Sequence, residues 1–492
     1  MNEQQSSYRQ IIKATSLFGG VQVFNIIIQI IRFKVIAVLL GPSGVGIIGL
    51  LNSTIGLIGS ITNFGLGTSA VKDIAAAYSN QDNQRVSIII TVARRLIFIT
   101  GIFGTLLALI FSPWLSQLTF GNRNYTYAFA WVSLTLFFNQ LCSGQLIVLQ
   151  GLRFLNHLAK ASITGSLLSL LLTLPLYFLW GLDGIVPGII GTSVITYIAS
   201  WFFSRKIKIT SIPINHSQIY FEGKKMLQLG FMISLSGLLT MAASYIVRIY
   251  ISQTGGVAQV GLYTAGFAII NTYVSLIFTS MSTDYFPRLS SVAYNNKLCK
   301  KVINQQAEVS ILIITPILIV FLTFINFVIL ILYTKEFAVV SDMLYWASLG
   351  MLFKAVGWSI SHIFLAKGAS KLFLLNELIA NIYQLILNVL GYKLFGLAGL
   401  GMSFVISYLL YLLQEFLIGN IMYKFAFENA FLKLFCIQFG LALLCFLSVH
   451  FFDSPHTYIL GILFIIFSSW YSLKELDKRI GLKSILTNLI KK

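Results

Sequence analysis

The chain has 492 residues, of which 57% are hydrophobic and only 10% are charged. A soluble protein of this length carries roughly 25% charged residues, so this composition excludes a soluble enzyme or binding module and predicts an integral membrane protein. The net charge of +19 does not indicate nucleic-acid binding, because the basic residues alternate with apolar runs along the chain and form no single patch.

Apolar runs long enough to cross a bilayer predict an all-α, polytopic protein with about fourteen transmembrane helices. In chain order the runs lie near residues 17–40, 45–70, 96–112, 126–149, 161–179, 185–204, 226–252, 257–282, 309–333, 343–366, 372–394, 397–420, 431–452 and 456–473. The segment 205–225 is a predicted cytoplasmic linker, and 474–492 is a predicted basic, amphipathic cytoplasmic tail.

The basic residues of the loops predict the orientation. Most of the 34 Lys and Arg residues lie in alternate loops, whereas the opposite loops contain only Arg123, Lys335 and Lys393. Because basic loops stay on the cytoplasmic side, we expect both termini to be cytoplasmic and the number of spans to be even.

Glycine motifs indicate an internal repeat. GPSGVG (41–46) and WGLDG (180–184) in the first half correspond to GGVAQVG (255–261) and FGLAG (395–399) in the second, and both 181 − 46 and 396 − 261 equal 135. Six spans are therefore duplicated in parallel, as in two-lobed transporters. The predicted domains are a six-helix lobe (1–204), the linker, a second six-helix lobe (226–420) and two additional helices (421–473).

Polar residues form stripes inside several predicted spans. A polar face toward lipid is unfavourable, so such stripes face other helices or a water-filled cavity. Helix-to-helix hydrogen bonding is the simpler explanation for the small polar residues; buried cations more strongly favour an anionic substrate. The candidate cavity lining is Gln22, Asn25, Gln29, Asn271, Asn381 and Gln384, and the candidate anion-binding residues are Arg32, Arg248 and Lys354.

Two carboxylates also fall within spans. Glu377 shares a polar face with Asn381 and Gln384, and Glu415 lies in the inner third of its span. Both are candidates for ion coupling, and an alternative is that they pair with the cations and only hold the bundle together. We expect no metal, because the four cysteines show no paired spacing, and no nucleotide or other cofactor, because no phosphate-binding loop is present.

Four segments carry a resemblance to a known family: GPSGVG (41–46), FGNRNY (120–125), LYTKEF (332–337) and SDMLYWASLGMLFKAVGWSISHIFLAKGASKLFLLNE (341–377). The sequence resembles the bacterial oligosaccharide flippases, the O-antigen translocase group of the multidrug/oligosaccharidyl-lipid/polysaccharide exporter superfamily, and within it the lipid III flippases of enterobacterial common antigen. It departs from these twelve-span proteins in its two additional C-terminal spans.

The resemblance implies two six-helix lobes around a cationic cavity that opens alternately to each side of the bacterial inner membrane. It implies an undecaprenyl-pyrophosphate-linked oligosaccharide as substrate, coupling to an ion gradient or the membrane potential, and polysaccharide polymerase or assembly machinery as a partner. The expected function is therefore transport and not catalysis.

Two other functions remain open at this stage. A multidrug exporter of the same superfamily would favour cationic drugs and an acidic cavity, whereas the ions within the spans are mainly basic. A membrane-embedded polysaccharide polymerase would need a cluster of His, Asp or Glu residues, and the five histidines are scattered along the chain.

Overall fold

The computed structural model describes residues 3–207, 216–453 and 455–480, and throughout these ranges the secondary structure is helical with no strand. The helices α1 to α8 and the 3₁₀ turn η1 are α1 (Glu3–Asn63), α2 (Leu66–Ser79), α3 (Asn83–Ile110), α4 (Ser112–Phe120), α5 (Thr126–Val132), α6 (Leu134–Gly151), α7 (Leu155–Trp180), η1 (Gly181–Gly184) and α8 (Ile185–Ser204). The remaining elements are α9 (His216–Gly255), α10 (Val257–Ser291), α11 (Asn296–Leu332), η2 (Lys335–Val340), α12 (Ser341–Ala366), α13 (Ser370–Tyr423), α14 (Asn429–Phe451) and α15 (His456–Ile480).

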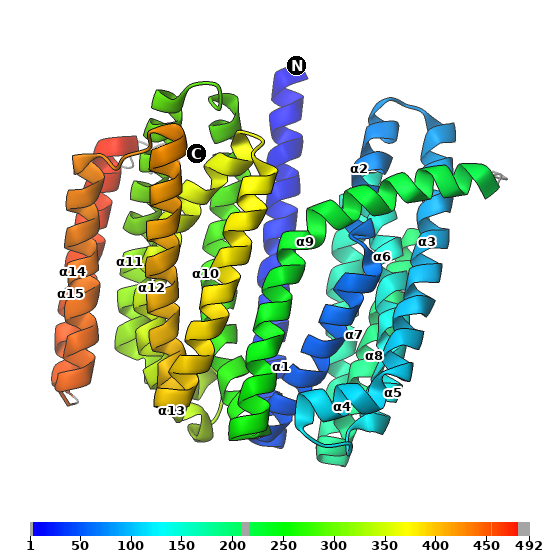
Figure 1. Cartoon of the computed structure of the whole chain (residues 1–492), viewed down its shortest axis with the longest axis horizontal. Coiled ribbons are helices and arrows are strands. Elements are labelled where there is room, and N and C mark those ends of the chain that lie inside the picture. The colour runs from blue at the N-terminus through cyan, green and yellow to red at the C-terminus, as the bar shows by residue number, and fades with distance from the viewer. Residues whose placement is uncertain (1–2, 208–215, 454, 481–492) are drawn as a thin grey trace. The chain divides into compact units, whose positions relative to one another are not determined.

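The all-α, polytopic class predicted from the sequence is confirmed (Figure 1). Ten helical stretches in the described residues are long and apolar enough to cross a membrane, so the predicted number of fourteen is not confirmed. Three of the ten stretches each cover two predicted spans, namely Gly20–Asn63, Leu155–Ser204 and Ser370–Tyr423. Each contains a glycine with positive φ at the predicted junction, namely Gly41, Gly181 and Gly396.

The helix α13 shows what such a glycine does. A straight helix of 54 residues would be about 80 Å long, far more than the ~30 Å of a bilayer core. Gly396 has φ 59° and ψ −138°, a conformation that residues with a Cβ avoid, and there the chain folds back on itself. A Cβ on Gly399 would lie only 1.9 Å from the carbonyl oxygen of Gly391, so the two halves meet at backbone contact.

Backbone conformation repeats along the chain with a constant offset. Three pairs of residues with positive φ have the same separation in sequence, since 256 − 41, 368 − 153 and 396 − 181 all equal 215. The pairs are Gly41 and Gly256, Arg153 and Gly368, and Gly181 and Gly396. Positive φ is uncommon, and its recurrence at one offset supports the duplication that the glycine motifs predict.

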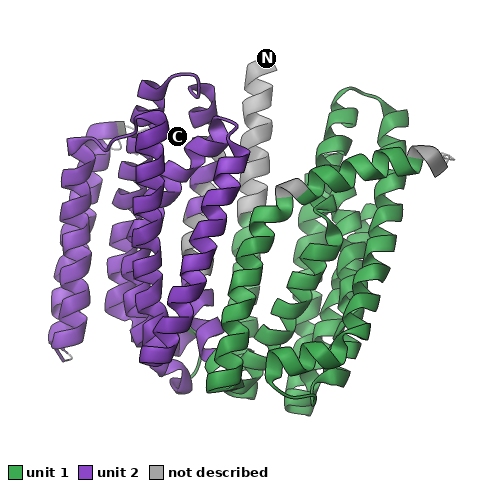
Figure 2. Cartoon of the chain, viewed as in Figure 1, with its two compact units in different colours: residues 1–261, 332–334 green, residues 262–331, 335–492 purple. Residues whose placement is uncertain are grey.

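The chain forms two compact units (Figure 2). Unit 1 comprises residues 1–261 and 332–334, and unit 2 comprises 262–331 and 335–492. Unit 1 includes α9, which packs against α1, α2, α3 and α4, and the division falls at Gly261 inside α10. The boundaries of the two predicted six-helix lobes stay a prediction, and parts of the predicted linker (208–215) and tail (481–492) lie outside the described residues.

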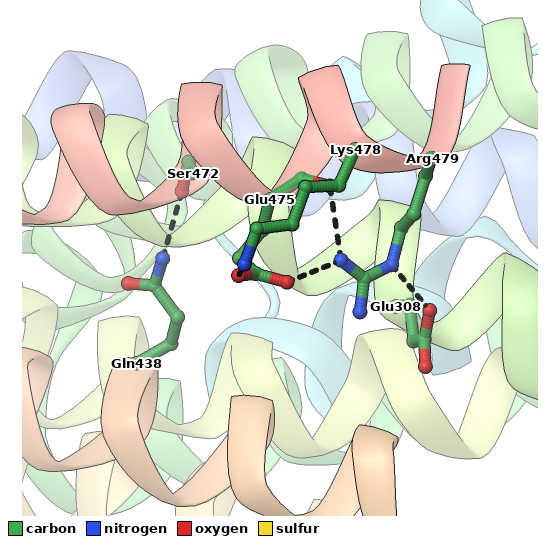
Figure 3. Close-up of polar contacts among 6 residues, drawn as sticks. All are labelled: Glu308, Gln438, Ser472, Glu475, Lys478 and Arg479. Atoms are coloured by element: carbon green, nitrogen blue, oxygen red, sulfur yellow. Dashed lines mark hydrogen bonds and ion pairs between the residues drawn. The ribbon is translucent and has the colours of Figure 1, made fainter. Parts of the chain in front are cut away.

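The last two helices, α14 and α15, pack against the rest of unit 2. Three phenylalanines at steps of four along α14, Phe431, Phe435 and Phe439, form a ladder that Phe427 extends into the preceding connection. The ring centre of Phe439 lies 5.2 Å from that of Phe353 of α12. Figure 3 shows the polar contacts, in which Gln438 donates to Ser472 at 2.7 Å and Arg479 pairs with Glu308 of α11 at 2.7 Å. The additional pair of helices is therefore an integral part of unit 2.

Candidate functional site

The predicted site residues fall in both compact units, and each set has its own surroundings. Unit 2 contains an acidic cluster on α13. Tyr411 donates a hydrogen bond of 2.9 Å to Glu377, Asn376 donates one to Glu415, and Gln414 donates one of 3.0 Å to the carbonyl oxygen of Asn376. The two carboxylates, which are far apart in the sequence, thus take part in neighbouring hydrogen bonds, because their partners include the adjacent residues Asn376 and Glu377.

The fold of α13 explains this assembly. Glu377 and Asn376 lie in its first half, and Tyr411 and Glu415 lie in its second half. Because the chain reverses at Gly396, positions on either side of this residue face one another in antiparallel register. Asn381, which was predicted on the same face as Glu377, is buried and donates a hydrogen bond of 2.8 Å to the Glu377 carbonyl oxygen, so it supports the helix at this site.

The cluster leaves oxygen atoms without partners. Glu415 is fully buried, and its Oε2 atom has no hydrogen-bond partner among the described residues. The same is true of the hydroxyl oxygens of Tyr383 and Ser407. A buried carboxylate without a cation is costly. Within the described residues, no Lys, Arg or His pairs with Glu377 or Glu415. The cluster therefore has the chemistry to accept a proton or a small cation.

Lys354 of α12 is half-buried in the same unit but does not neutralise these carboxylates. Its Nζ atom lies 5.0 Å from the ring centre of Tyr408 and 5.8 Å from that of Phe404, as in cation–π contacts. Aromatic faces attract a cation without cancelling its charge. The alternative explanation of the buried cations, that they only pair with Glu377 or Glu415, is not seen at Lys354 in the described part of the chain.

Arg32 lies on α1 in unit 1. Its side chain is half-buried, and its Nε atom is buried with no hydrogen-bond partner in the described part of the chain. Tyr177 of α7 is close enough to interact with it electrostatically, and among the described residues no carboxylate forms an ion pair with it. Arg32 is thus a cation within a membrane span that keeps hydrogen-bonding capacity for a ligand.

Arg248 has different surroundings. It lies on α9, which belongs to unit 1, and its NH1 atom donates a hydrogen bond of 2.5 Å to Ser244 one turn earlier. Arg248 therefore lies in the same compact unit as Arg32. Its guanidinium is at least partly committed to its own helix.

The remaining candidates on α1 divide into two kinds. Asn25 donates to Ser162 at 3.0 Å and accepts from Ser166 at 2.9 Å, both on α7, so it joins two helices as the simpler explanation expects. Gln22 and Gln29 are exposed. In unit 2, Gln384 is half-buried, and the side chain of Asn271 lies outside the described residues.

Sequence reasoning missed the partners of the acidic cluster. Asn376, Tyr411, Gln414 and the aromatic residues beneath Lys354 were not predicted. Tyr411 and Glu415 are four residues apart and therefore share a helix face, which is a signal that could have been noticed. The pairing of Tyr411 with Glu377 depends on the register of the folded-back helix, which no pattern in the sequence specifies.

Comparison with solved structures defines the class. The chain is similar to an inward-facing multidrug resistance MATE family transporter of the MOP superfamily, with a TM-score of 0.70, 17% identity, and coverage of 84% of this chain and 96% of that one. It is also similar to the lipid II flippase MurJ in an inward closed conformation, with a TM-score of 0.63, 14% identity, and coverage of 95% and 99%. The chain therefore shares the polytopic helical fold of these two proteins.

The family follows from the sequence comparisons. The chain belongs to the family of polysaccharide biosynthesis proteins, whose profile matches residues 35–342. Among curated proteins it is similar to the lipid III flippases of Escherichia coli (strain K12) and Shigella flexneri, each 24% identical over 354 residues, which cover 70% of this chain and 82% of the relative. The resemblance inferred from the sequence segments is thus confirmed.

Proposed function

We propose that this protein is a flippase that moves an undecaprenyl-pyrophosphate-linked oligosaccharide, an O-antigen or similar surface-polysaccharide unit, from the inner to the outer leaflet of the bacterial inner membrane by alternating access. The family, the transporter fold and the relatives that carry the name lipid III flippase support a lipid-linked substrate. We also propose that both termini are cytoplasmic and that the product passes to polysaccharide polymerase or assembly machinery.

One observation carries the proposal: Arg32 and Lys354 are cations within membrane spans, and no carboxylate of the described residues forms an ion pair with either. An unneutralised pyrophosphate cannot cross hydrocarbon, and an uncompensated cation is itself unfavourable there. Each charge offsets the desolvation cost of the other. A guanidinium is well suited to phosphate because it donates two parallel hydrogen bonds.

The other candidates take supporting roles in the proposal. Gln22, Gln29 and Gln384 supply amide groups for sugar hydroxyls, and Arg248 supplies a second guanidinium once it releases Ser244. Glu377 and Glu415 supply the coupling site. Because the two carboxylates take part in neighbouring hydrogen bonds and pair with no cation of the described residues, a proton or Na⁺ that binds there removes an unfavourable charge and can favour one conformation of the transporter.

The test is complementation of a flippase-deficient strain. Arg32→Ala and Lys354→Ala should abolish complementation at normal protein levels, and Arg32→Lys should restore it only in part, because a lysine makes one point contact where an arginine makes two. Arg123→Ala, which removes an exposed arginine from a short connection, is the matched control. Normal transport by both alanine variants would overturn the proposal, and loss of folded protein instead would assign these cations to stability.

A multidrug exporter is the second candidate, and the similarity to the MATE transporter favours it. Its expected substrates are cationic drugs, which the positive charges of Arg32 and Lys354 would repel. Overexpression of the protein should then leave susceptibility to cationic dyes unchanged. A severalfold increase in resistance, lost in the Glu377→Gln variant, would favour the exporter.

A further inference from the structure

The first part of α9 has surroundings that the proposed function does not use. This helix has 40 residues, about 60 Å at 1.5 Å per residue, whereas its membrane-spanning part is Ser234–Gly255. Figure 1 shows that its N-terminal part turns away from the direction of the spans and runs toward α3. Residues 219–231, here called the α9 foot, are the described side chains of this part.

One face of the foot is anchored to unit 1. Met226 is buried in a core cluster with residues of α2, α3 and α6, and Ile219 and Leu227 pack against the same cluster. Gly230 meets the backbone between α1 and α2, where a Cβ would lie 2.4 Å from the Phe64 carbonyl oxygen. The foot is therefore held in one orientation, with one face against the protein and the other turned outward.

An ion pair removes the negative charge from the outward face. Arg85 of α3 donates two hydrogen bonds to Glu222, of 2.6 and 2.8 Å, and the Glu222 side chain is only 14% exposed. These hydrogen bonds hold the pKa of the Glu222 carboxyl below its usual value. Glu222 is the sole acidic residue of the foot, so what the foot presents outward is cationic.

The outward face combines aromatic rings and positive charge. Tyr220 and Phe221 are 72% and 70% exposed, and Lys224 and Lys225 are exposed one turn further along. The end of α8 precedes the foot along the chain and also combines an aromatic ring with a positive charge. There the guanidinium of Arg205 lies 4.6 Å from the ring centre of Trp201. Exposed aromatic rings insert at the boundary between headgroups and acyl chains, and lysines beside them attract anionic headgroups.

We infer that the α9 foot binds the membrane surface, with Tyr220 and Phe221 inserted among the lipids and Lys224 and Lys225 in contact with anionic phospholipid headgroups. The geometry favours this partner over a protein, because both aromatic residues and both lysines are exposed on one face of a helix that continues directly into the membrane-spanning stretch Ser234–Gly255. The inference goes beyond the proposed function and does not depend on the transported substrate.

The test places a fluorescent reporter on the foot of the full-length protein. Tyr220→Trp is reconstituted into vesicles that contain brominated phosphatidylglycerol or brominated phosphatidylcholine, and the parent, with its 7 tryptophans, supplies the background. Bromine quenches only a tryptophan that contacts the lipid. We expect the added fluorescence to be quenched, at least about twofold more by the anionic lipid at equal content.

Charge variants show whether the lysines cause this preference. Adding Lys224→Gln and Lys225→Gln should make the two lipids equally effective, whereas the matched double change Lys335→Gln and Lys393→Gln, at exposed lysines elsewhere, should leave the preference intact. A tryptophan at position 220 that neither lipid quenches would overturn the inference, as when a protein covers this face. Equal quenching by both lipids in the Tyr220→Trp protein that keeps Lys224 and Lys225 would also overturn the inference.

Discussion

Tyr411 donates a hydrogen bond of 2.9 Å to Glu377 and so joins the two antiparallel halves of α13 at the acidic cluster. The same half that carries Tyr411 carries Glu415, whose Oε2 atom finds no hydrogen-bond partner within the residues that the structure describes. Binding of a proton or a cation to this cluster would change the contact between two membrane spans. This relationship makes the cluster the first place to test for coupling.

Glu377→Gln should abolish the dependence of transport on an imposed pH or sodium gradient. The amide still accepts the hydrogen bond from Tyr411, so the protein should fold, but it can neither bind a proton at physiological pH nor attract a cation. Transport by reconstituted protein is measured with and without the gradient, and Glu336→Gln, at an exposed position, is the control. A full response in the Glu377→Gln variant would exclude this residue from coupling.

Gly396→Ala should destabilise unit 2 by about 1–3 kcal/mol, because an L-residue is strained at φ 59° and ψ −138°. A Cβ at position 396 would meet no other atom within 4 Å, and the same holds for Gly440 in α14. Gly440→Ala is therefore a matched control in which only the helical backbone differs, and it should be neutral or slightly stabilising. Thermal unfolding in detergent measures both, and equal effects would contradict the assigned role of positive φ.

Reporter fusions should establish the proposed orientation. A fusion at 122–124 or at 335–336 should report the outer side, and a fusion at 297–301 or in the segment 210–218 should report the cytoplasm. The reason is the concentration of Lys and Arg residues in alternate loops, which resist translocation. A cytoplasmic signal at 335–336 would contradict both the orientation and the predicted number of spans.

The ion pair between Arg85 and Glu222 predicts a dependence on pH. Because the folded-state pKa of Glu222 is lowered from its usual 4.5 by the hydrogen bonds from Arg85, the pair stabilises the folded protein above pH 4.5, and this stability is lost as the pH falls through the lowered value. The contribution is on the order of 1 kcal/mol, because Arg85 is partly exposed.

The measurement compares the midpoint of thermal unfolding of the parent with that of Glu222→Gln. The variant should be less stable at pH 7, and the difference should shrink as the pH is lowered below 4.5. Glu336→Gln, whose carboxylate is exposed, should match the parent at every pH. If the difference between the two unfolding midpoints stays constant below pH 4.5, Glu222 acts through packing and not through its charge.

The sequence by itself determined the class of the protein and its repeat. Apolar content decides between water and lipid as the solvent, so composition was sufficient for the all-α, polytopic fold. The repeat was also visible, because the backbone at junctions such as Gly181 (φ 54°, ψ −127°) and Gly396 (φ 59°, ψ −138°) adopts a conformation that only glycine takes readily. Arg32 and Lys354 could be singled out from sequence because a cation within an apolar run is costly wherever the helix packs.

Only the tertiary structure decided which of these residues have partners. The register of the two halves of α13 brings Tyr411 to Glu377, and a shift by one residue would separate them. The placement of α9 with unit 1 likewise depends on side chains such as Met226, which fit a core made by other helices. Hydrophobic periodicity in the sequence shows which face of a helix is buried. The partner that covers this face is decided by close packing between segments that are distant in the sequence.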